Sequence, residues 1–477
     1  MISILFELVK LFFEVGILVF SISILTSYLI LATISAREII FYIKKNSFVD
    51  FKSILSSTIS PSVSLLAPAY NEGKTIVENV RSLLSLHYSN YEVLIINDGS
   101  KDDSLQQLID NYELEKVNFF VDEKVPAKKV LGVYKSKNPA FFKLTVVDKQ
   151  NGGKADALNV GINVAKYDIV AAIDVDCIIE DDALLKMVKP FLEETEKKTI
   201  ATGGVVRIAN SCEVRLGRIT KIRLPEKFLP RIQVLEYMRA FLLGRMAWSK
   251  LDGLLLISGA FGMFDKQTVI NVGGYNHKTV GEDMELVVRM RMYMHEQNLP
   301  YRVAFIPDPL CWTEAPETWK ILGRQRNRWT RGTAETLTLH KKLFFNSRYG
   351  ILGMLSFPYW FFFEWLAPLI EFTGFMFFLY LVVTHQVYWM FFLCLLGVVY
   401  CFALFLSTIA ILSEEISFHQ YKKTSEMLKL IGTAMVEPLF FHPITVYWAI
   451  KGNIDLIRGK KSWGEMSRTG FANKKTS

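Results

Sequence analysis

Residues 63–100 carry the pattern that decides the fold: VSLLAPAYNEGKTIVENVRSLLSLHYSNYEVLIINDGS. The stretch begins with a short apolar strand at residues 63–67 and continues with a helix-like segment at residues 75–86. A second apolar strand follows at residues 91–96. This order of strand, helix and strand is typical of a doubly wound α/β sheet. We therefore expect an α/β domain in the middle of the chain.

The same alternation continues downstream. After a charged insertion near residues 125–143, residues 144–147 predict a third strand, residues 154–165 a helix and residues 169–173 another strand. In sheets of this kind, ligands bind beyond the carboxyl ends of the strands. Polar side chains follow the predicted strands at that point, namely Asn71, Glu72, Asp98, Asp174 and Asp176. The sequence therefore predicts a ligand site at this edge of the sheet.

An apolar stretch at residues 11–33 is interrupted only by Glu14 and is long enough to span a bilayer. A cleaved signal peptide is the alternative, but its basic region should precede the stretch, whereas Arg37, Lys44 and Lys45 follow it. Basic residues concentrate on the cytoplasmic side of membrane proteins. We therefore expect a transmembrane anchor whose first residues face outward and whose following domain is cytoplasmic.

The chain becomes strongly apolar again after Tyr349. Residues 351–383 are too long for one span and contain Glu364, Pro368 and Glu371 near the middle. Because the basic tail is expected to be cytoplasmic, an even number of crossings must follow the central domain, so we expect two tight spans there. Residues 389–412 form a clear span and residues 430–450 a weaker one, giving five spans in a multi-pass protein of the cell (inner) membrane. The predicted division is an anchor at 1–50, a cytoplasmic domain with interfacial helices at 51–345, transmembrane helices at 346–452 and a cytoplasmic tail at 453–477.

The net charge of +8 arises from 55 basic and 47 acidic residues. Basic loops facing anionic lipid explain this excess, and no nucleic-acid-binding signature is present, so we expect a membrane partner and no nucleic acid. Residues 234–256 mix basic and aromatic side chains, which suits either a core helix or a helix at the membrane interface. The five cysteines show no zinc or disulfide spacing and are expected as free thiols.

Asp174 and Asp176 follow a predicted strand and are two residues apart, so their side chains share one face. Two carboxylates in that position can hold a divalent cation directly or through water. Hard oxygen ligands favour Mg²⁺ or Mn²⁺, which usually also bind substrate phosphates. We expect one of these ions as the cofactor.

Two further motifs each allow two interpretations. Glu282 and Asp283 lead into a helix-like segment, where they either stabilise the helix N-terminus or supply a general base. Residues 325–329, with the sequence QRNRW, either bind a pyrophosphate through arginine and a sugar through Trp329, or form a basic helix at the membrane surface.

Taken in order, the motifs resemble those of the processive family 2 glycosyltransferases, the group of cellulose, chitin, hyaluronan and poly-N-acetylglucosamine synthases. The resemblance runs from Ser62 to Trp329. Its motifs are NDGS at 97–100, NGGKADALN at 151–159, DVD at 174–176, ED at 282–283 and QRNRW at 325–329, the last fitting the Q-x-x-R-W signature of polymerising members. One departure is Gly281 before the Glu-Asp pair, where many members have threonine; the carboxylate is kept.

The resemblance implies a nucleotide-sugar-binding domain of the GT-A, Rossmann-like type, flanked by transmembrane helices. It also implies roles for individual residues. The nucleotide and its diphosphate would contact Ala69, Asn71, Glu72, Asp98, Lys154, Asp174 and Arg328, and the metal would contact Asp174 and Asp176. Asp283 would be the catalytic base, and the acceptor would contact Trp329, Gln325, Glu282, Ser258 and Gly259.

The implied activity is an inverting transfer from a UDP-sugar to a growing β-linked polysaccharide, which the apolar spans would then pass across the membrane. UDP-N-acetylglucosamine is the preferred donor by family analogy alone. One alternative is transfer of a single sugar to a polyprenyl phosphate lipid, against which Q-x-x-R-W speaks. Another is a transporter or scaffold without activity, which leaves the ordered acidic motifs unexplained.

Overall fold

The computed structural model describes residues 11–46, 60–193, 196–215 and 217–460. The chain divides into two compact units, which we describe separately. Among the described residues, the sheet unit is formed within Lys44–Pro230 and Leu254–Pro316. The helical unit consists of Met1–Ile43, Arg231–Gly253 and Glu317–Gly464. Both units are therefore assembled from segments that lie far apart in the sequence.

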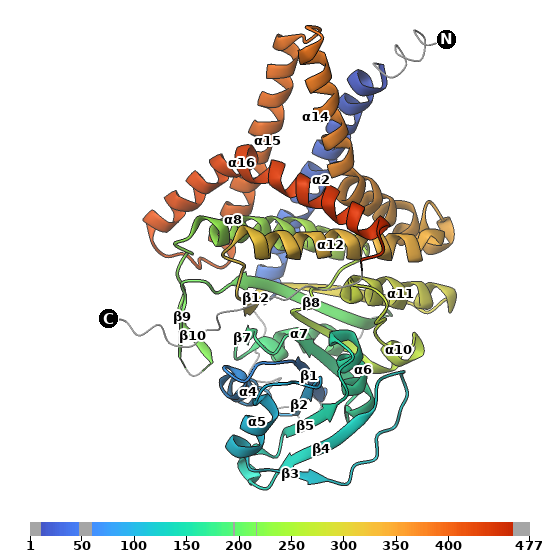
Figure 1. The fold of residues 1–477 in the computed structure, drawn as a ribbon, viewed down its shortest axis with the longest axis vertical. Helices are drawn as coiled ribbons and strands as arrows, with labels where there is room; N and C mark the ends of the chain where they lie inside the picture. The colour runs from blue at the N-terminus through green and yellow to red at the C-terminus, as the bar shows by residue number, and fades with distance from the viewer. Residues whose placement is uncertain (1–10, 47–59, 194–195, 216, 461–477) are drawn as a thin grey trace. The chain divides into compact units, whose positions relative to one another are not determined.

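Within the described residues, the sheet unit contains a ten-stranded mixed sheet in the order β3-β4-β5-β2-β1-β6-β11-β8-β12-β7 (Figure 1). A separate hairpin pairs β9 with β10. The strands are β1 (Val63–Ala69), β2 (Tyr91–Asn97), β3 (Leu114–Val117), β4 (Val130–Ser136), β5 (Leu144–Lys149), β6 (Ile169–Ile173), β7 (Ile178–Ile179), β8 (Lys198–Ile208), β9 (Glu213–Arg215), β10 (Arg218–Lys221), β11 (Phe261–Asp265) and β12 (Tyr301–Thr313). The helices of this unit are α4 (Ile76–Leu84), α5 (Ser104–Tyr112), η2 (Pro139–Phe141), α6 (Lys154–Val164), α7 (Ala183–Leu192), α10 (Lys266–Asn271) and α11 (Glu282–Glu296).

The centre of the sheet is parallel, with β5, β2, β1 and β6 as neighbours. Nearly every residue of β1 is buried, as expected for a parallel strand covered on both faces. Helix α6 packs against β1 and β2. A side chain at Gly161 of α6 would come within 3.1 Å of Leu66 and 3.2 Å of Ile96, so the glycine permits the close approach of helix and sheet.

The predicted α/β alternation is confirmed, because β1, α4, β2, β5, α6 and β6 occupy the predicted positions to within a few residues. Residues 125–143 were predicted only as a charged insertion, and that prediction missed a strand. The segment contains β4, which pairs antiparallel with β3 and β5 near the sheet edge. Only Gly132 and Val133 of β4 are buried, so its other positions tolerate polar and charged side chains, which conceals the strand in the sequence.

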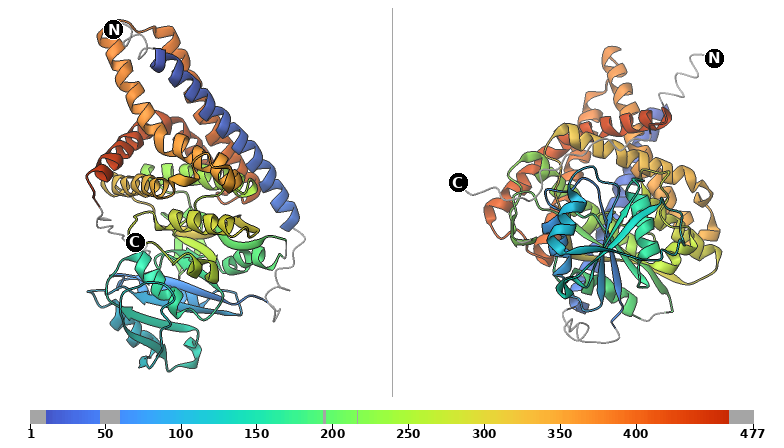
Figure 2. Two further views of the ribbon diagram at one scale, coloured as in Figure 1. Left: turned by 90° about the vertical axis from the view of Figure 1, so that its right-hand side faces the viewer. Right: turned by 60° about the horizontal axis from the view of Figure 1, so that its bottom comes forward.

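The helical unit contains three helices, within the described part of the chain, that are long and apolar enough to cross a membrane: Ile17–Asn46, Leu352–Val383 and Trp389–Ser417. Figure 2 shows the first running beside the other two, and stacked rings join it to the second, with Phe13 and Phe377 centroids 4.5 Å apart. The helices of this unit are η1 (Phe12–Gly16), α2 (Ile17–Asn46), η3 (Arg239–Arg245), α9 (Met246–Lys250), α12 (Trp319–Leu339), η4 (Lys341–Leu343), η5 (Ser347–Tyr349), η6 (Leu352–Ser356), α13 (Phe357–Tyr359), η7 (Trp360–Leu366), α14 (Ala367–Val383), α15 (Trp389–Ser417) and α16 (Thr424–Ile457), and α8 (Phe228–Met238) begins before it.

The predicted split of residues 351–383 into two spans is wrong. The structure has one continuous helix, Leu352–Val383, in which π-helical segments η6 and η7 precede Pro358 and Pro368. The wider π turns accommodate the missing N–H groups and the proline rings, so the helix continues instead of reversing. Residues 430–450, predicted as a weaker span, lie within α16, which is not among the three candidate spans.

Residues 234–256, for which a core helix and an interfacial helix were both possible, form most of the helical run α8–η3–α9. Phe241, Leu242 and Trp248 on this run are buried. Arg239 makes a two-pronged ion pair with Glu437 of α16, both contacts at 2.8 Å. This face of the run therefore packs as a core helix does, and Arg239 neutralises the buried Glu437 carboxylate.

Candidate active site

The register of the parallel strands brings the predicted polar residues to one edge. Ala69 at the end of β1 lies opposite Asn97 of β2, and Asn97 lies opposite Asp148 of β5. Because β11 runs antiparallel to β6, with Phe261 opposite Ile173, the loop before β11 reaches the same edge. The predicted residues at this edge are Ala69, Asn71, Glu72, Asp98, Lys154, Asp174, Asp176, Ser258 and Gly259.

The loops after β1 and β2 are tied together by hydrogen bonds. The backbone N–H of Asn71 donates to Ser100 Oγ at 3.0 Å, and that of Glu72 donates to Ser104 Oγ at 2.9 Å. In return, Asn71 Oδ1 accepts from the N–H of Lys101 at 2.8 Å. Asn71 has a φ of 57°, a conformation that asparagine tolerates better than most residues. These bonds hold the predicted nucleotide loop in one shape.

Asp98 is buried, and its carboxylate is the centre of a network. It accepts hydrogen bonds from the backbone N–H groups of Gly152 at 2.9 Å and Gly153 at 2.8 Å. The ammonium of Lys149, itself fully buried, contacts Asp98 and also Asp156 at 2.7 Å. Asp98 therefore fixes the loop that leads into α6.

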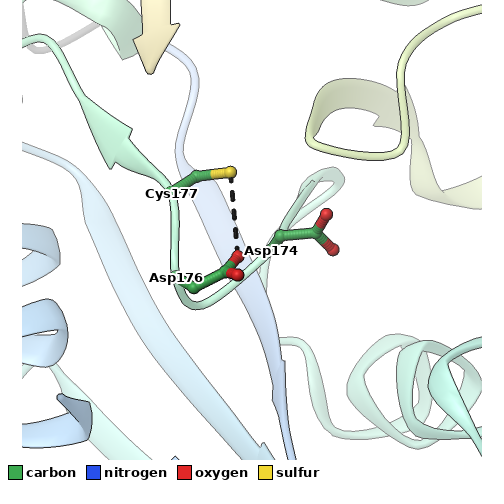
Figure 3. A group of neighbouring side chains, drawn as sticks. All are labelled: Asp174, Asp176 and Cys177. Atoms are coloured by element: carbon green, nitrogen blue, oxygen red, sulfur yellow. Dashed lines mark hydrogen bonds between the residues drawn. The ribbon is translucent and has the colours of Figure 1, made fainter. Parts of the chain in front are cut away.

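Asp174, Val175, Asp176 and Cys177 form a tight turn after β6, closed by a hydrogen bond of 2.9 Å from the N–H of Cys177 to the carbonyl of Asp174. One ligand atom each from Asp174, Asp176 and Cys177 lies within 4.8 Å of the others. In Figure 3 the sulfur of Cys177 faces the Asp176 carboxylate at 3.9 Å, while Asp174 extends from the other end of the turn. The turn thus gathers three possible metal ligands.

Lys154, the first residue of α6, joins two parts of the site. Its ammonium donates to Asp174 Oδ1 at 2.5 Å and to the carbonyl of Gly259 at 2.9 Å. Burial alone would lower the pKa of Lys154, but Asp174, Glu282 and Asp283 together outweigh burial and raise it. The ammonium therefore stays charged at neutral pH, close to three carboxylates.

Asp283 lies in the first turn of α11 and reaches the same loop from the other side. Its Oδ2 accepts a hydrogen bond of 3.0 Å from the N–H of Gly259, and its Oδ1 accepts one of 2.9 Å from the N–H of Met284. The Gly259 residue is thus held by Asp283 at its N–H and by Lys154 at its carbonyl. Neighbouring Glu282 is buried.

The residues of the Q-x-x-R-W motif lie on α12 in the helical unit. Spacings of three and four place Gln325, Arg328 and Trp329 on one side of the helix. Trp329 is 40% exposed, and the Arg326 guanidinium stacks 4.4 Å from its ring centre. The opposite side of α12 faces α16, where Asn327 donates to Asp455 at 2.9 Å. The motif therefore presents an exposed tryptophan from a helix anchored on its other side.

The sequence matches the family model described as "Glycosyltransferase like family 2" over residues 61–332, more than half of the chain. This match contains the acidic motifs and the loops described above. The chain belongs to glycosyltransferase family 2.

Relatives of this transferase agree with that assignment. Poly-beta-1,6-N-acetyl-D-glucosamine synthase of Staphylococcus epidermidis is 30% identical over 298 residues, covering 62% of this chain and 61% of the relative. The synthase of the same name from Staphylococcus aureus (strain COL) is 30% identical over 303 residues, covering 63% and 60%. The transferase thus matches about three fifths of the length of these relatives.

Among solved structures, a mannosyltransferase from Pyrobaculum calidifontis in complex with GDP-Man and Mn²⁺ overlaps 92% of this transferase and 100% of that chain. The sequence identity is 15% and the TM-score 0.49. The family assignment rests on the sequence match over residues 61–332.

Sequence reasoning missed Lys149 and Cys177 in the transferase. Lys149 ends strand β5, directly after Asp148, and precedes the Gln-Asn-Gly-Gly stretch, so a charged residue at a strand end was the available signal. Cys177 directly follows the Asp-x-Asp motif, but a single cysteine without a zinc-like spacing gave no reason to include it.

Proposed function

We propose that this family 2 transferase is an inverting enzyme that adds sugar units from a UDP-sugar to a growing β-linked polysaccharide. The observation that carries the proposal is the hydrogen-bonded series Asp283–Gly259–Lys154–Asp174. It connects a carboxylate able to accept a proton with a cation and a carboxylate able to position a diphosphate. A donor and an acceptor meeting at Gly259 would have these groups on either side.

The donor is proposed to bind along the carboxyl edge of the sheet. The tied loop from Ala69 to Glu72 and the loop fixed by Asp98 would hold the nucleotide, and Lys154 would face its phosphates. A lysine ammonium suits this task because it presents three donors to phosphate oxygens.

The turn after β6 fits a divalent cation. Asp174 and Asp176 supply carboxylate oxygens, the ligands that Mg²⁺ and Mn²⁺ prefer, and the donor atoms lie close enough to converge. When bound, such an ion would neutralise negative charge on the diphosphate as it departs.

The proposed chemical step is a single displacement. The Asp283 carboxylate accepts the proton of the acceptor hydroxyl, and the hydroxyl oxygen forms a bond to the anomeric carbon. The bond from that carbon to the diphosphate breaks, and UDP departs with the electron pair, which Lys154 helps to stabilise. The Q-x-x-R-W motif by itself implies a diphosphate contact for Arg328. Attack opposite the leaving group converts an α-linked donor into a β-linked product.

In the sheet unit, the acceptor is proposed to contact Ser258, Gly259 and Glu282. The Q-x-x-R-W motif by itself implies an acceptor role for Gln325 and Trp329 of α12. The exposed Trp329 ring offers an apolar surface on which a sugar face can rest. N-acetylglucosamine is the proposed sugar, because the related Staphylococcus epidermidis protein is a poly-beta-1,6-N-acetyl-D-glucosamine synthase, of which the match covers 61%. The proposed location is the inner membrane, with the sheet unit cytoplasmic.

The alternative is transfer of one sugar to a polyprenyl phosphate lipid. Q-x-x-R-W favours the polymerising reaction, and the two activities give different products. Both would release UDP, so product size is the deciding quantity.

The test incubates membranes containing the full chain with a panel of radiolabelled UDP-sugars and Mg²⁺ or Mn²⁺, then separates products by size and by extraction into organic solvent. A large water-soluble product made from one UDP-sugar supports the proposal, with Asp283→Asn membranes as the control. A short product in the organic phase supports the alternative. Absence of UDP release with every donor contradicts both.

A further inference from the structure

Arg326 occupies one of the two variable positions of the Q-x-x-R-W motif, and its guanidinium lies over the ring of Trp329, 4.4 Å from the ring centre. We propose that Arg326, held by Glu236 of α8, is a positioning residue that fixes the Trp329 ring as the platform for the acceptor sugar. The inference deepens the proposed function, because it rests on the acceptor role that the motif implies for Trp329. All three residues belong to the helical unit.

The position of Arg326 on α12 explains its contact with Trp329. The two residues are three positions apart, and side chains at that spacing are neighbours on a helix surface. The negative face of an indole ring attracts a guanidinium that lies over it. The guanidinium covers one face of the ring, and 40% of the Trp329 surface remains exposed. A sugar can therefore rest on the face that Arg326 leaves open.

Glu236 determines where the Arg326 guanidinium lies. Its Oε2 accepts a hydrogen bond of 2.6 Å from Arg326 Nη2, which joins α8 to α12 (Figure 1). The Arg326 side chain is 14% exposed and that of Glu236 is 18% exposed, so water screens the attraction between them only weakly. Arg239 attracts Glu236 as well, but its two-pronged hydrogen bonding goes to Glu437. Glu236 thus holds Arg326 in place over Trp329.

The fixed guanidinium has a consequence for acceptor binding. A tryptophan that can rotate about its side-chain bonds loses that freedom when a sugar binds to it, and this loss weakens the affinity. Stacking on Arg326 orders the Trp329 ring before the acceptor arrives. Removing the guanidinium should therefore weaken acceptor binding by about 2–10-fold, without any contact between Arg326 and the sugar. If Arg326 instead competed with the sugar for the ring, its removal would strengthen acceptor binding.

The first experiment observes the Trp329 ring by fluorine NMR of the full chain, labelled with 5-fluorotryptophan and purified in detergent. Trp329→Phe identifies the Trp329 resonance among those of the nine tryptophans. Arg326→Met should shift and broaden this resonance. Glu236→Gln should move it in the same direction and should add nothing to the effect of Arg326→Met in the double variant, since Glu236 acts through Arg326. A resonance that is unchanged in Arg326→Met overturns the proposal, and additive shifts overturn the role of Glu236.

Two further variants protect this experiment against misfolding. Arg326→Lys keeps a positive charge beside Glu236 but removes the planar guanidinium from the indole, so the resonance should still move. If Arg326→Met fails to fold, an unchanged resonance in Arg326→Lys overturns the proposal. The matched control is Lys250→Met, which breaks the Lys250–Glu38 pair of 2.8 Å in the same unit and should leave the Trp329 resonance in place. Circular dichroism of each variant shows whether it is folded.

The second experiment measures acceptor use with UDP-N-acetylglucosamine as donor and a β-1,6-linked N-acetylglucosamine pentasaccharide as the acceptor probe. Arg326→Met should raise the KM for the pentasaccharide by about 2–10-fold and leave the KM for the donor unchanged. A lower KM for the pentasaccharide would show competition for the ring and overturn the proposal.

The two experiments separate the positioning role from the proposed function. If wild type transfers no sugar but the Trp329 resonance responds to Arg326→Met and Glu236→Gln as expected, only the proposed function is contradicted. If wild type transfers sugar to the pentasaccharide and Arg326→Met does so with an unchanged KM, only the positioning role of Arg326 is contradicted.

Discussion

Lys154 and Asp174 form an ion pair of 2.5 Å between the start of α6 and the turn after β6. The same ammonium binds the Gly259 carbonyl, so one lysine links the diphosphate side of the proposed site to the loop that Asp283 holds. This position orders the site around Lys154 and places its ammonium where we propose that the donor phosphates bind.

Lys154→Met should weaken donor binding, because it removes the ammonium from the phosphates and leaves Asp174 without its cation. A hydrogen bond to a charged group contributes ~1.5–3 kcal/mol, which corresponds to a loss of about 10–100-fold in UDP-sugar affinity. Isothermal titration of the purified protein measures this directly. Lys198→Met, which breaks the Lys198–Asp265 pair of 2.8 Å elsewhere in the sheet unit, is the matched control and should bind normally. Equal affinities in wild type and Lys154→Met would remove Lys154 from the donor site.

Asp176→Asn tests the metal site without changing side-chain size. The variant should bind Mn²⁺ about 10–100-fold more weakly, and EDTA should abolish transfer by wild type. Electron paramagnetic resonance of free Mn²⁺ gives the affinity independently of activity. Full transfer by wild type in EDTA would contradict a metal requirement.

Lys149→Met tests the network around Asp98. Removing one partner of a buried ion pair leaves uncompensated charge and costs ~3–5 kcal/mol, so the melting temperature should fall strongly. The control is Lys137→Met, which breaks the exposed Lys137–Glu115 pair of 3.1 Å and should cost no more than ~1 kcal/mol. Thermal unfolding of both variants, followed by tryptophan fluorescence, makes the comparison. Similar melting temperatures would show that the Lys149 network does not stabilise the sheet unit.

Trp329→Ala tests the acceptor role of α12. Loss of an aromatic contact worth ~0.5–1.5 kcal/mol should weaken acceptor binding by about 2–10-fold and shorten the polymer, while UDP-sugar affinity stays normal. Trp319→Ala is the matched control, since Trp319 is on the same helix and is 46% exposed against 40% for Trp329. The length of the polymer made by each variant is the measurement. If Trp329→Ala makes polymer of normal length, Trp329 is a surface anchor and not a sugar contact.

The sequence predicted those parts of the molecule that depend on local pattern. The apolar strand β6 followed by Asp174 could be recognised because strand and acidic turn are contiguous. Lys149 was missed, because its charged position at a strand end does not reveal that it pairs with Asp98 of a distant segment and with Asp156 of α6 in the folded protein. The split of residues 351–383 was wrong because it was inferred from the length of the stretch and from a tail expected to be cytoplasmic, whereas the helix continues through Pro368 after the π-helical segment η7.

Asp283→Asn is the most direct test of the proposed mechanism, because it keeps the size of the side chain and removes the proton acceptor. A general base contributes ~10²–10⁴-fold, and transfer should fall by about that factor. UDP-sugar should still bind, since Lys154 and the Asp174 turn are unchanged.

The competing explanation is that Asp283 only stabilises the start of α11, which is worth ~0.3–1 kcal/mol and would leave a folded enzyme nearly fully active. Asp182→Asn measures that smaller effect, because Asp182 precedes α7 at its N-terminus and pairs with Lys186 at 2.9 Å. The measurement compares donor affinity and transfer rate for wild type and both variants. Near-normal transfer by Asp283→Asn would falsify the assignment of the base. If Asp283→Asn loses donor binding, Asp283 does not lie on the acceptor side of Gly259, because replacing a base that contacts only the acceptor leaves the donor site intact.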